Sequence, residues 1–463
     1  MNEQCSILKQ RSLTTFLTAL TLLTTSVVTN AQSVLDEYIR LGLENNRQLI
    51  REQLDAEIQR EVLQEAKGKY LPDIFLDASY IRADGGRTIN VAAGDLVNPA
   101  YDGLNQLLGS EVYPTTIQNV SEQFLPDDFH ETKIRLIQPI LNTDIYFNKR
   151  IQQSRLAGQE AKKKAYENQL VKEIKVAYYK HLSAREQVKI LRSTESILQE
   201  LLRVSKRQVA NDKATKEIIF GAQAEISKLQ SQMASAERQE KVSAIFFNYL
   251  ISRPLNEPIS TEEQIPENSD NVENLDNLTN SAIDRREELN EINFGLEALR
   301  AATLLNKRYI VPEINLVGDL GYQGFGYEFD NTQDFWFLRL GLTWPIFQGN
   351  QNKAKIQQSL LREKQLESEL RETTDLISLE VAEAYYGYEE ALKILTARQS
   401  ERKSAAENFR IIEKKYAQNL VIQVTYNDAR NTYTTAQLQE VIARYTVRIR
   451  KAALQAAIAY KDL

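Results

Sequence analysis

The distribution of proline and glycine is the feature that most limits what this chain can fold into. Between Asn350 and Ala417 there is no proline and only one glycine, Gly387, so nothing interrupts a helical hydrogen-bond ladder there. Apolar side chains recur at spacings of three and four residues in this stretch: Ile377, Val381, Ala384, Tyr388, Ala391 and Leu395. This spacing predicts a very long helix that packs side by side with others in a coiled coil.

The first half of the chain carries the same pattern. One apolar seam, with Glu195 as its only charged member, runs through Ile174, Ala177, His181, Ala184, Val188, Leu191, Leu198 and Leu202. A second seam runs through Ile219, Ala222, Ile226, Leu229, Met233, Ala236 and Phe247. A helix over residues 144–209 would be roughly 100 Å long at 1.5 Å per residue, far longer than a globular helix. We therefore expect a long coiled coil here too.

The stretch from Phe335 to Gly349 alternates with a period of two, which predicts a strand. Trp336, Leu338, Leu340, Leu342 and Trp344 share one face, and Arg339, Gly341 and Thr343 share the other. The two tryptophans stand about 26 Å apart along a strand, close to the apolar band of about 25 Å between the aromatic girdles of a membrane barrel. Trp336 and Trp344 are therefore candidate girdle residues. A half-buried strand of a soluble sandwich needs the same alternation, so this stretch alone leaves both alternatives open.

The sequence also contains an internal repeat, in which its second half resembles its first half. Three segments of the first half recur in the second: Glu173–Tyr179 as Glu380–Tyr386, Leu136–Leu141 as Leu342–Phe347, and Leu71–Leu76 as Val311–Leu316. The intervals between the copies predict that the first strand-to-strand loop is roughly 34 residues longer than the second. Each copy is predicted as helix, strand, loop, strand, long helix, turn and long helix.

Pro72, Pro139, Pro312 and Pro345 mark the predicted junctions between strands and helices. In the first copy we expect a helix over 34–69, a strand with Ile74, Leu76, Ala78 and Tyr80 on one face, a surface loop over 82–131, and a strand over 132–138. In the second we expect a helix over 281–309, a strand with Ile314, Leu316, Leu320 and Tyr322 on one face, and a loop at Gly321–Gly326. The predicted domains are a signal peptide (1–31), a first repeat (32–253), an equatorial joining segment (254–280) and a second repeat (281–463).

The N-terminal residues have the pattern of a secretory signal. The apolar run Leu13–Val28 follows Lys9 and Arg11 and ends before Thr29-Asn30-Ala31, which predicts cleavage after Ala31. A retained anchor helix is the weaker alternative, because the run is short for a bilayer span. The single cysteine, Cys5, would be removed, so the mature chain would have no disulfide, thiolate metal site or cysteine nucleophile.

No motif in the chain indicates an enzyme, a metal site or a cofactor. Of the two histidines, His130 stands in the predicted long loop without the second histidine of a zinc-protease motif, and His181 lies on an apolar seam. The basic run Lys162–Lys164 is most simply a solvated helix face. A formal net charge of −6 argues against a nucleic-acid partner.

The chain resembles the TolC-like outer-membrane efflux protein family over essentially its whole mature length. The motifs that carry the resemblance appear in order: Val34–Ile39, Leu43–Asn46, Leu71–Asp73, Phe247–Pro254, Arg286–Leu289 and Gly341–Gly349. The resemblance implies a mainly helical fold with membrane β-structure. In it, a homotrimer closes a twelve-stranded barrel in the outer membrane, with four strands per chain, and continues into the periplasm as a helical coiled-coil barrel. Physics supports oligomerisation independently, because four strands cannot close and open edges are not tolerated in lipid.

The resemblance also implies sites at the turns between the long helices. A periplasmic adaptor protein is expected to grip these two tips, at Asn211, Asp212, Lys213 and Ala214 and at Asn419, Leu420 and Val421. Asp212 and Asn419 replace the family's usual tip glycine, and both residue types tolerate a left-handed turn. Asp428 matches one acid of the family's carboxylate constriction, and Thr425 stands where a second acid often sits. The simpler alternative for Asp428 is a solvated helix face.

The sequence therefore predicts a passive channel in the bacterial outer membrane that reaches into the periplasm. In this hypothesis an inner-membrane transporter, coupled through the adaptor, drives substrates through a duct embedded in outer-membrane lipid. Two alternatives stay open at this stage. The duct could serve type I protein secretion instead of efflux, or the chain could be a periplasmic coiled-coil scaffold without a pore.

Overall fold

The computed structural model of the protein describes residues 33–261 and 273–460, so the predicted signal peptide and part of the joining segment lie outside it. The elements are α2 (Val34–Asn45), α3 (Arg47–Gly68), β1 (Asp73–Ile81), β2 (Thr88–Val91), α4 (Ala93–Leu108), β3 (Val120–Gln123), β4 (Phe129–Leu141), α5 (Thr143–Ala210), α6 (Glu217–Leu250), α7 (Leu275–Arg285), α8 (Glu287–Lys307), η1 (Arg308–Ile310), β5 (Glu313–Phe325), β6 (Asp334–Thr343), α9 (Gln351–Ala417) and α10 (Gln423–Ala457).

The chain forms two compact units. The first, here called the helical unit, contains the described residues up to Leu54, Glu160–Asn290 and Leu370 onward. The second, the sheet unit, contains Asp55–Gln159 and Glu291–Glu369. Helices α3, α5, α8 and α9 each contribute residues to both units.

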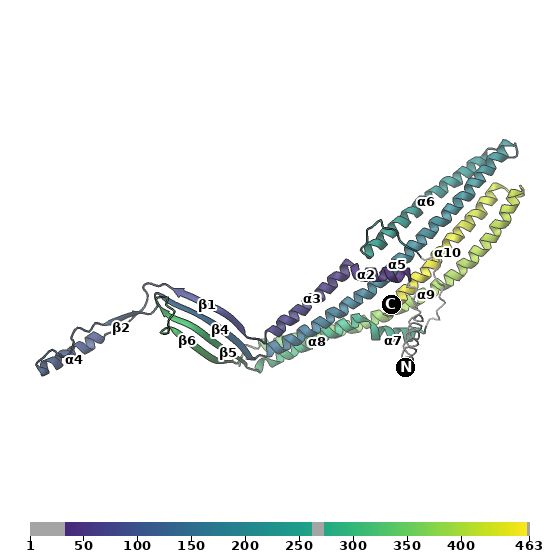
Figure 1. The fold of residues 1–463 in the computed structure, drawn as a ribbon. Coiled ribbons are helices and arrows are strands. Elements are labelled where there is room, and N and C mark those ends of the chain that lie inside the picture. Colours follow the sequence, from purple (N-terminus) through teal and green to yellow (C-terminus); the bar gives the residue numbers. More distant parts are fainter. Residues whose placement is uncertain (1–32, 262–272, 461–463) are drawn as a thin grey trace, which may run out of the picture. The chain divides into compact units, whose positions relative to one another are not determined.

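Two long hairpins, α5–α6 and α9–α10, form most of the helical unit (Figure 1). Helices α5 and α9 have 68 and 67 residues and begin and end within a residue or two of the predicted bounds. All four helices contribute to one apolar cluster, which includes Leu198, Ile226, Phe409 and Tyr426. The prediction of long helices that pack side by side is therefore confirmed.

The seam of α5 differs from the prediction in its C-terminal part. Thr194, not Glu195, is buried at this point, and its hydroxyl lies 3.4 Å from that of Thr434 on α10. Further along the helix, Leu201 is buried more deeply than the predicted Leu202. The buried positions 188, 191, 194, 198 and 201 include two successive steps of three residues, so the inward face moves by one position relative to a strict alternation of three and four.

The predicted helices over 34–69 and 281–309 are each broken by one extended residue. Asn46 separates α2 from α3; its Oδ1 accepts the N–H groups of Gln48 and Leu49, and its Nδ2 donates to the carbonyl of Leu250 at 2.8 Å. Arg286 separates α7 from α8 in the same way. Its guanidinium binds Glu288, Glu380 and the carbonyl of Ala457. At each break a polar side chain therefore forms hydrogen bonds with a segment far away in the sequence.

The sheet unit contains a four-stranded antiparallel sheet in the order β1-β4-β5-β6. Register partners across all four strands place Leu76, Ile134, Leu320 and Trp336 in one row. All four side chains of this row are apolar and more than half exposed in a single copy of the chain; Trp336, for example, is 78% exposed. The predicted apolar face is therefore real, and both sheet edges, β1 and β6, are open within the described chain.

The opposite face of the sheet carries charged pairs on its central strands, with Phe75 and Phe337 beside them on the edge strands. Arg135 binds Asp319 through two hydrogen bonds of 2.6 and 2.7 Å, and the Lys133 ammonium lies 2.5 Å from Glu131 and 3.8 Å from Asp77. Lys133 lies opposite Gly321 in the register of β4 and β5. A Cβ atom at Gly321 would come within 2.2 Å of the Thr132 carbonyl oxygen. One face of the sheet thus suits lipid, and the other suits water.

Three local expectations for the sheet are wrong. Strand β4 does not stop at Pro139 but continues through an irregular register to Leu141. Strand β5 runs on to Phe325, so the expected loop at Gly321–Gly326 is almost entirely strand. His130 lies in β4 and not in a loop, fully buried against Tyr327 and Phe329. At Pro139 and at Gly321–Gly326, backbone pairing with the neighbouring strand outweighs the local preference of proline or glycine for a break.

The residues between β1 and β4 are not a plain loop. This segment (82–128), called the insertion below, contains the antiparallel pair β2–β3 and the 16-residue helix α4. Pro99 lies inside α4, although a proline in a sequence normally argues against a helix interior.

Among the helices of the described chain, none is both long and apolar enough to cross a bilayer. No cluster of three or more potential metal-ligating side chains occurs among the residues that the structure describes.

Candidate functional site

The two turns between the long helices have the same construction. Asp212 and Asn419 adopt positive φ values of 55° and 59°, the left-handed conformation that was expected where the family has glycine. In each turn the next N–H closes back on the helix: Lys213 donates to the Gln208 carbonyl at 2.8 Å, and Leu420 donates to the Lys415 carbonyl at 2.9 Å. Gln208 also donates to the side chain of Asn419, 3.1 Å away, and so ties the two tips together.

The tip residues predicted from the sequence are mostly solvent-facing. Asn211, Asp212, Lys213, Asn419 and Leu420 are exposed, and Ala214 and Val421 are half-buried. Ile422, at the end of the second predicted tip, is more than half exposed, and so are two apolar side chains that sequence reasoning missed, Phe220 and Val424. An exposed apolar patch with polar neighbours is the usual composition of a protein-binding surface.

Asp428 and Thr425 lie on α10 with exposed side chains, whereas Tyr426 and Ala429 face the core. The carboxylate of Asp428 forms no ion pair within the described parts of the chain. The structure therefore brings Asp428 and Thr425 to the surface of α10, one helical turn apart.

A buried ion pair two residues after Asp428 was not predicted. Arg430, 2% exposed, binds Glu225 of α6 at 2.6 Å, and Asn431 donates to the same carboxylate oxygen at 3.3 Å. Burial lowers the pKa of the Arg430 guanidinium, and the charge of Glu225 opposes this shift. Burial also raises the pKa of the neighbouring Tyr426 to about 12. Arg430 and Asn431 thus join α10 to α6 directly beside Asp428, the candidate constriction residue.

The run Lys162–Lys164 is not a free solvated face as expected. Lys162 pairs with Glu52 of α3 at 3.0 Å, and Lys164 pairs with Glu287 of α8 at 3.7 Å. These long cationic side chains connect α5 to the shorter helices α3 and α8.

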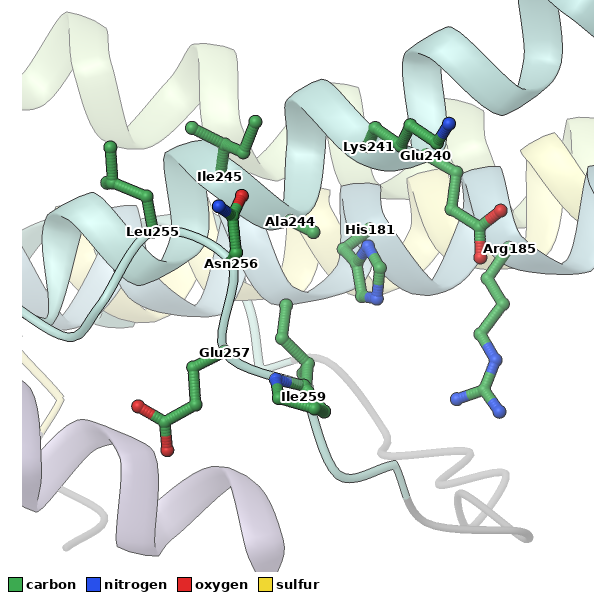
Figure 2. A pocket seen from close by; sticks show the side chains of 11 residues that line it. His181, Arg185, Glu240, Lys241, Ala244, Ile245, Leu255, Asn256, Glu257 and Ile259 are labelled. Atoms are coloured by element: carbon green, nitrogen blue, oxygen red, sulfur yellow. The ribbon is translucent and has the colours of Figure 1, made fainter.

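A cavity of about 560 Å³ lies between α5, α6 and the segment that follows α6 (Figure 2). His181 of α5 faces it, together with Ala244, Leu255 and Ile259. The Ser243 hydroxyl donates its proton to the Glu240 backbone carbonyl at 2.8 Å. His181 Nδ1 lies 3.3 Å from Ser243 Oγ. Because the hydroxyl proton is already used, the imidazole has to donate in this second contact. Burial lowers the pKa of His181, Arg185 lowers it further, and Glu240 opposes the shift.

This shift gives a pH prediction. Because the folded state holds the pKa of His181 below its ordinary value of 6.5, the unfolded chain binds more protons as the pH falls below that value. Stability should therefore fall on acidification below about pH 6.5, with a slope of at most about 1.4 kcal/mol per pH unit from this one group. Thermal unfolding at neutral and acidic pH should show that His181→Gln loses less stability than the unmodified protein. Equal losses in the two proteins would contradict the assignment.

Comparison with known proteins agrees with this architecture. Residues 278–459 match a family described as outer membrane efflux protein. No curated protein matches the chain. Among solved structures, a membrane protein from Pseudomonas aeruginosa superposes with a TM-score of 0.75 at 17% identity, covering 92% of this chain and 94% of that one.

Two further solved structures are similar. The outer membrane protein VceC from Vibrio cholerae gives a TM-score of 0.72 at 14% identity, with 92% of this chain and 95% of that chain covered. The MtrE outer membrane channel of Neisseria gonorrhoeae, solved in an open state, gives 0.73 at 16% identity, with 92% and 88% covered. The chain thus has the fold of these solved outer membrane proteins over nearly all of its length, and residues 278–459 match the outer membrane efflux protein family.

Proposed function

We propose that the protein is a passive exit duct in the bacterial outer membrane, formed by three copies of the chain. Each copy contributes four strands to a twelve-stranded barrel and two helical hairpins to a tunnel that extends into the periplasm. An inner-membrane transporter, joined to the tunnel by a periplasmic adaptor, supplies the energy, and the duct itself catalyses no reaction and needs no cofactor.

One observation carries this proposal: the two faces of an open four-stranded sheet. Its exposed apolar face suits outer-membrane lipid, and its charged face, with Arg135–Asp319 and Lys133–Glu131, suits a water-filled lumen. Unpaired backbone groups at the edges β1 and β6 would each cost several kcal/mol in lipid. Pairing β6 of one copy with β1 of the next removes both edges, and it closes the sheet when the copies form a ring.

The matched tips support the proposed partner. Two turns of the same geometry, joined by the contact between Gln208 and Asn419, present apolar side chains that nothing in a single copy of the described chain covers. We assign them to the adaptor, with contacts at Asn211 to Ala214, at Asn419 to Val421, and at the newly found Phe220 and Val424. Efflux is favoured over type I protein secretion because the family matched by residues 278–459 is named for efflux.

Membrane fractionation and bilayer recording test the proposal. We expect the protein to leave the membrane only in detergent, to run as a heat-labile trimer, and to conduct ions in planar bilayers. Release by osmotic shock as a monomer or dimer without conductance would support the periplasmic scaffold and overturn the duct.

Asp428 provides a specific test of the proposed constriction. In a trimer, three Asp428 carboxylates on α10 would line the tunnel near its axis and attract cations. Replacing Asp428 by alanine removes an attraction of about 1–2 kcal/mol for a multivalent cation, so half-block should need roughly tenfold more cation. Single-channel recording with a trivalent blocker measures this change, and Thr425→Ala, one turn away, is the matched control. Equal block in both variants would remove Asp428 from the constriction.

A further inference from the structure

The insertion between β1 and β4 has an internal structure held by side-chain amides. Asn98 of α4 both donates to the Ile117 carbonyl at 2.7 Å and accepts the Ile117 N–H at 2.9 Å. Asn105, about two turns further on, donates to the Tyr113 carbonyl at 2.7 Å and accepts the N–H groups of Val112 and Tyr113. One side of α4 is thus fixed to the returning segment, which sets the direction of its other side.

That other side is apolar and exposed. Leu96 is 76% exposed and Leu107 is 85% exposed, and Leu104 and Leu108 are also exposed. Residues 93, 96, 100, 104 and 107 follow one another at spacings of three and four, the pattern with which helices pack against copies of themselves. The small Ala100 and Gly103 lie on the same stripe and allow close approach. We call Leu96, Ala100, Gly103, Leu104 and Leu107 the leucine stripe.

Charge argues against a lipid surface as the occupant of the stripe. From Thr88 to Asp128 the chain contains no lysine or arginine and six acidic side chains. Helices that lie in a membrane interface are rich in lysine and arginine and bind anionic headgroups. An acidic helix without a single cation would be repelled by such a surface.

The position of the insertion in the chain points instead to other copies of the protein. The insertion leaves Ile81 and returns at Phe129, and these two residues are register partners at one end of β1 and β4. Because β1 is a sheet edge that must pair with the next copy, a closed ring would carry three insertions, all rooted at the same end of the barrel.

We propose that the leucine stripes of three copies pack against one another and form an apolar cap at that end of the barrel. The cap rests on the proposed trimer and adds a second closure, distinct from the constriction at Asp428. It leaves the acidic side chains Asp95 and Asp102, on the far side of α4, in water. A cap of this kind has to part whenever a substrate leaves.

Disulfide cross-linking tests the cap. In a Cys5→Ser background the chain has no other thiol, so Leu107→Cys and the control Asp102→Cys can be compared directly. Both positions are exposed, but Asp102 lies on the opposite side of α4 from the stripe. Mild oxidation of the detergent-solubilised trimer should convert Leu107→Cys to covalent dimers in at least about tenfold higher yield than Asp102→Cys, independent of protein concentration; Leu96→Cys repeats the test at a second position.

Other outcomes overturn the proposal. Conducting trimers in which Leu107→Cys and Leu96→Cys do not cross-link would refute the cap and leave the duct intact, whereas isolated monomers would refute both. Cross-linking that rises with protein concentration would assign the stripe to contacts between trimers. An environment-sensitive dye attached to the thiol of the Leu107→Cys variant gives a further check. A blue shift of its emission on addition of phosphatidylglycerol vesicles would assign the stripe to lipid.

Discussion

Replacement of Leu340 by arginine is expected to abolish the stable trimer. Leu340 lies midway between Trp336 and Trp344, on the exposed apolar face, and pairs with Leu316. An arginine at the middle of the lipid-facing band of a membrane barrel costs about 2–4 kcal/mol, and the cost recurs in each copy. Semi-native electrophoresis and urea unfolding in lipid should both show the loss.

The matched control for this substitution lies in the neighbouring row of the sheet. Asn315→Arg puts the same side chain at nearly the same depth but on the charged face, opposite Gly341, where there is room for it. This variant should form trimers as well as the unmodified protein does. If the two arginines had equal effects, the assignment of the faces to lipid and lumen would be wrong.

Replacement of Arg430 by methionine should have the second-largest effect. The change leaves the Glu225 carboxylate without its buried partner, and breaking a buried ion pair in this way costs roughly 3–5 kcal/mol. Because the Glu225 side chain keeps 21% of its exposure, we expect a loss near the lower end of that range. Hydrogen exchange in α6 and α10 should accelerate, and the channel should conduct more when the two helices separate.

Two variants make this second prediction specific. Arg410→Met removes an arginine from an exposed pair with Glu407 and should leave exchange rates unchanged. Adding Glu225→Leu to Arg430→Met should recover part of the lost stability, because the unpaired buried charge is then gone. An Arg430→Met protein as stable as Arg410→Met would show that the pair does not hold the hairpins together.

Much of the fold could be predicted because its largest elements depend on signals spread over many residues. The bounds of α5 and α9 follow from long stretches without proline and from many correctly spaced apolar residues. The alternation from Trp336 to Leu342 identified β6 and its two faces for the same reason. Errors of one position, such as Glu195 in place of Thr194, do not accumulate into a different fold.

Features that depend on a single residue could not be predicted in this way. Nothing in the sequence around Arg286 indicates a helix break. Asn46 belongs to a residue type that is favoured at helix N-caps, but both breaks are also stabilised by contacts with residues far away along the chain. The Arg430–Glu225 pair joins residues 205 positions apart, although a charged side chain just after the buried Tyr426 and Ala429 was a local sign of it. Helix α4 was hidden by Pro99, although its leucines have helical spacing.

The composition of the insertion also bears on how it would behave at a cell surface. Trypsin cuts after lysine and arginine, and it has no cleavage site between Arg87 and Lys133, whatever the conformation of the segment. Treatment of intact cells with trypsin would therefore spare α4 and its flanking strands, while a glutamate-specific protease has Glu111 and Glu122 to attack. Residues 88–128 are thus resistant to trypsin by sequence alone, whereas Arg82 and Arg87 at the start of the insertion can still be cleaved.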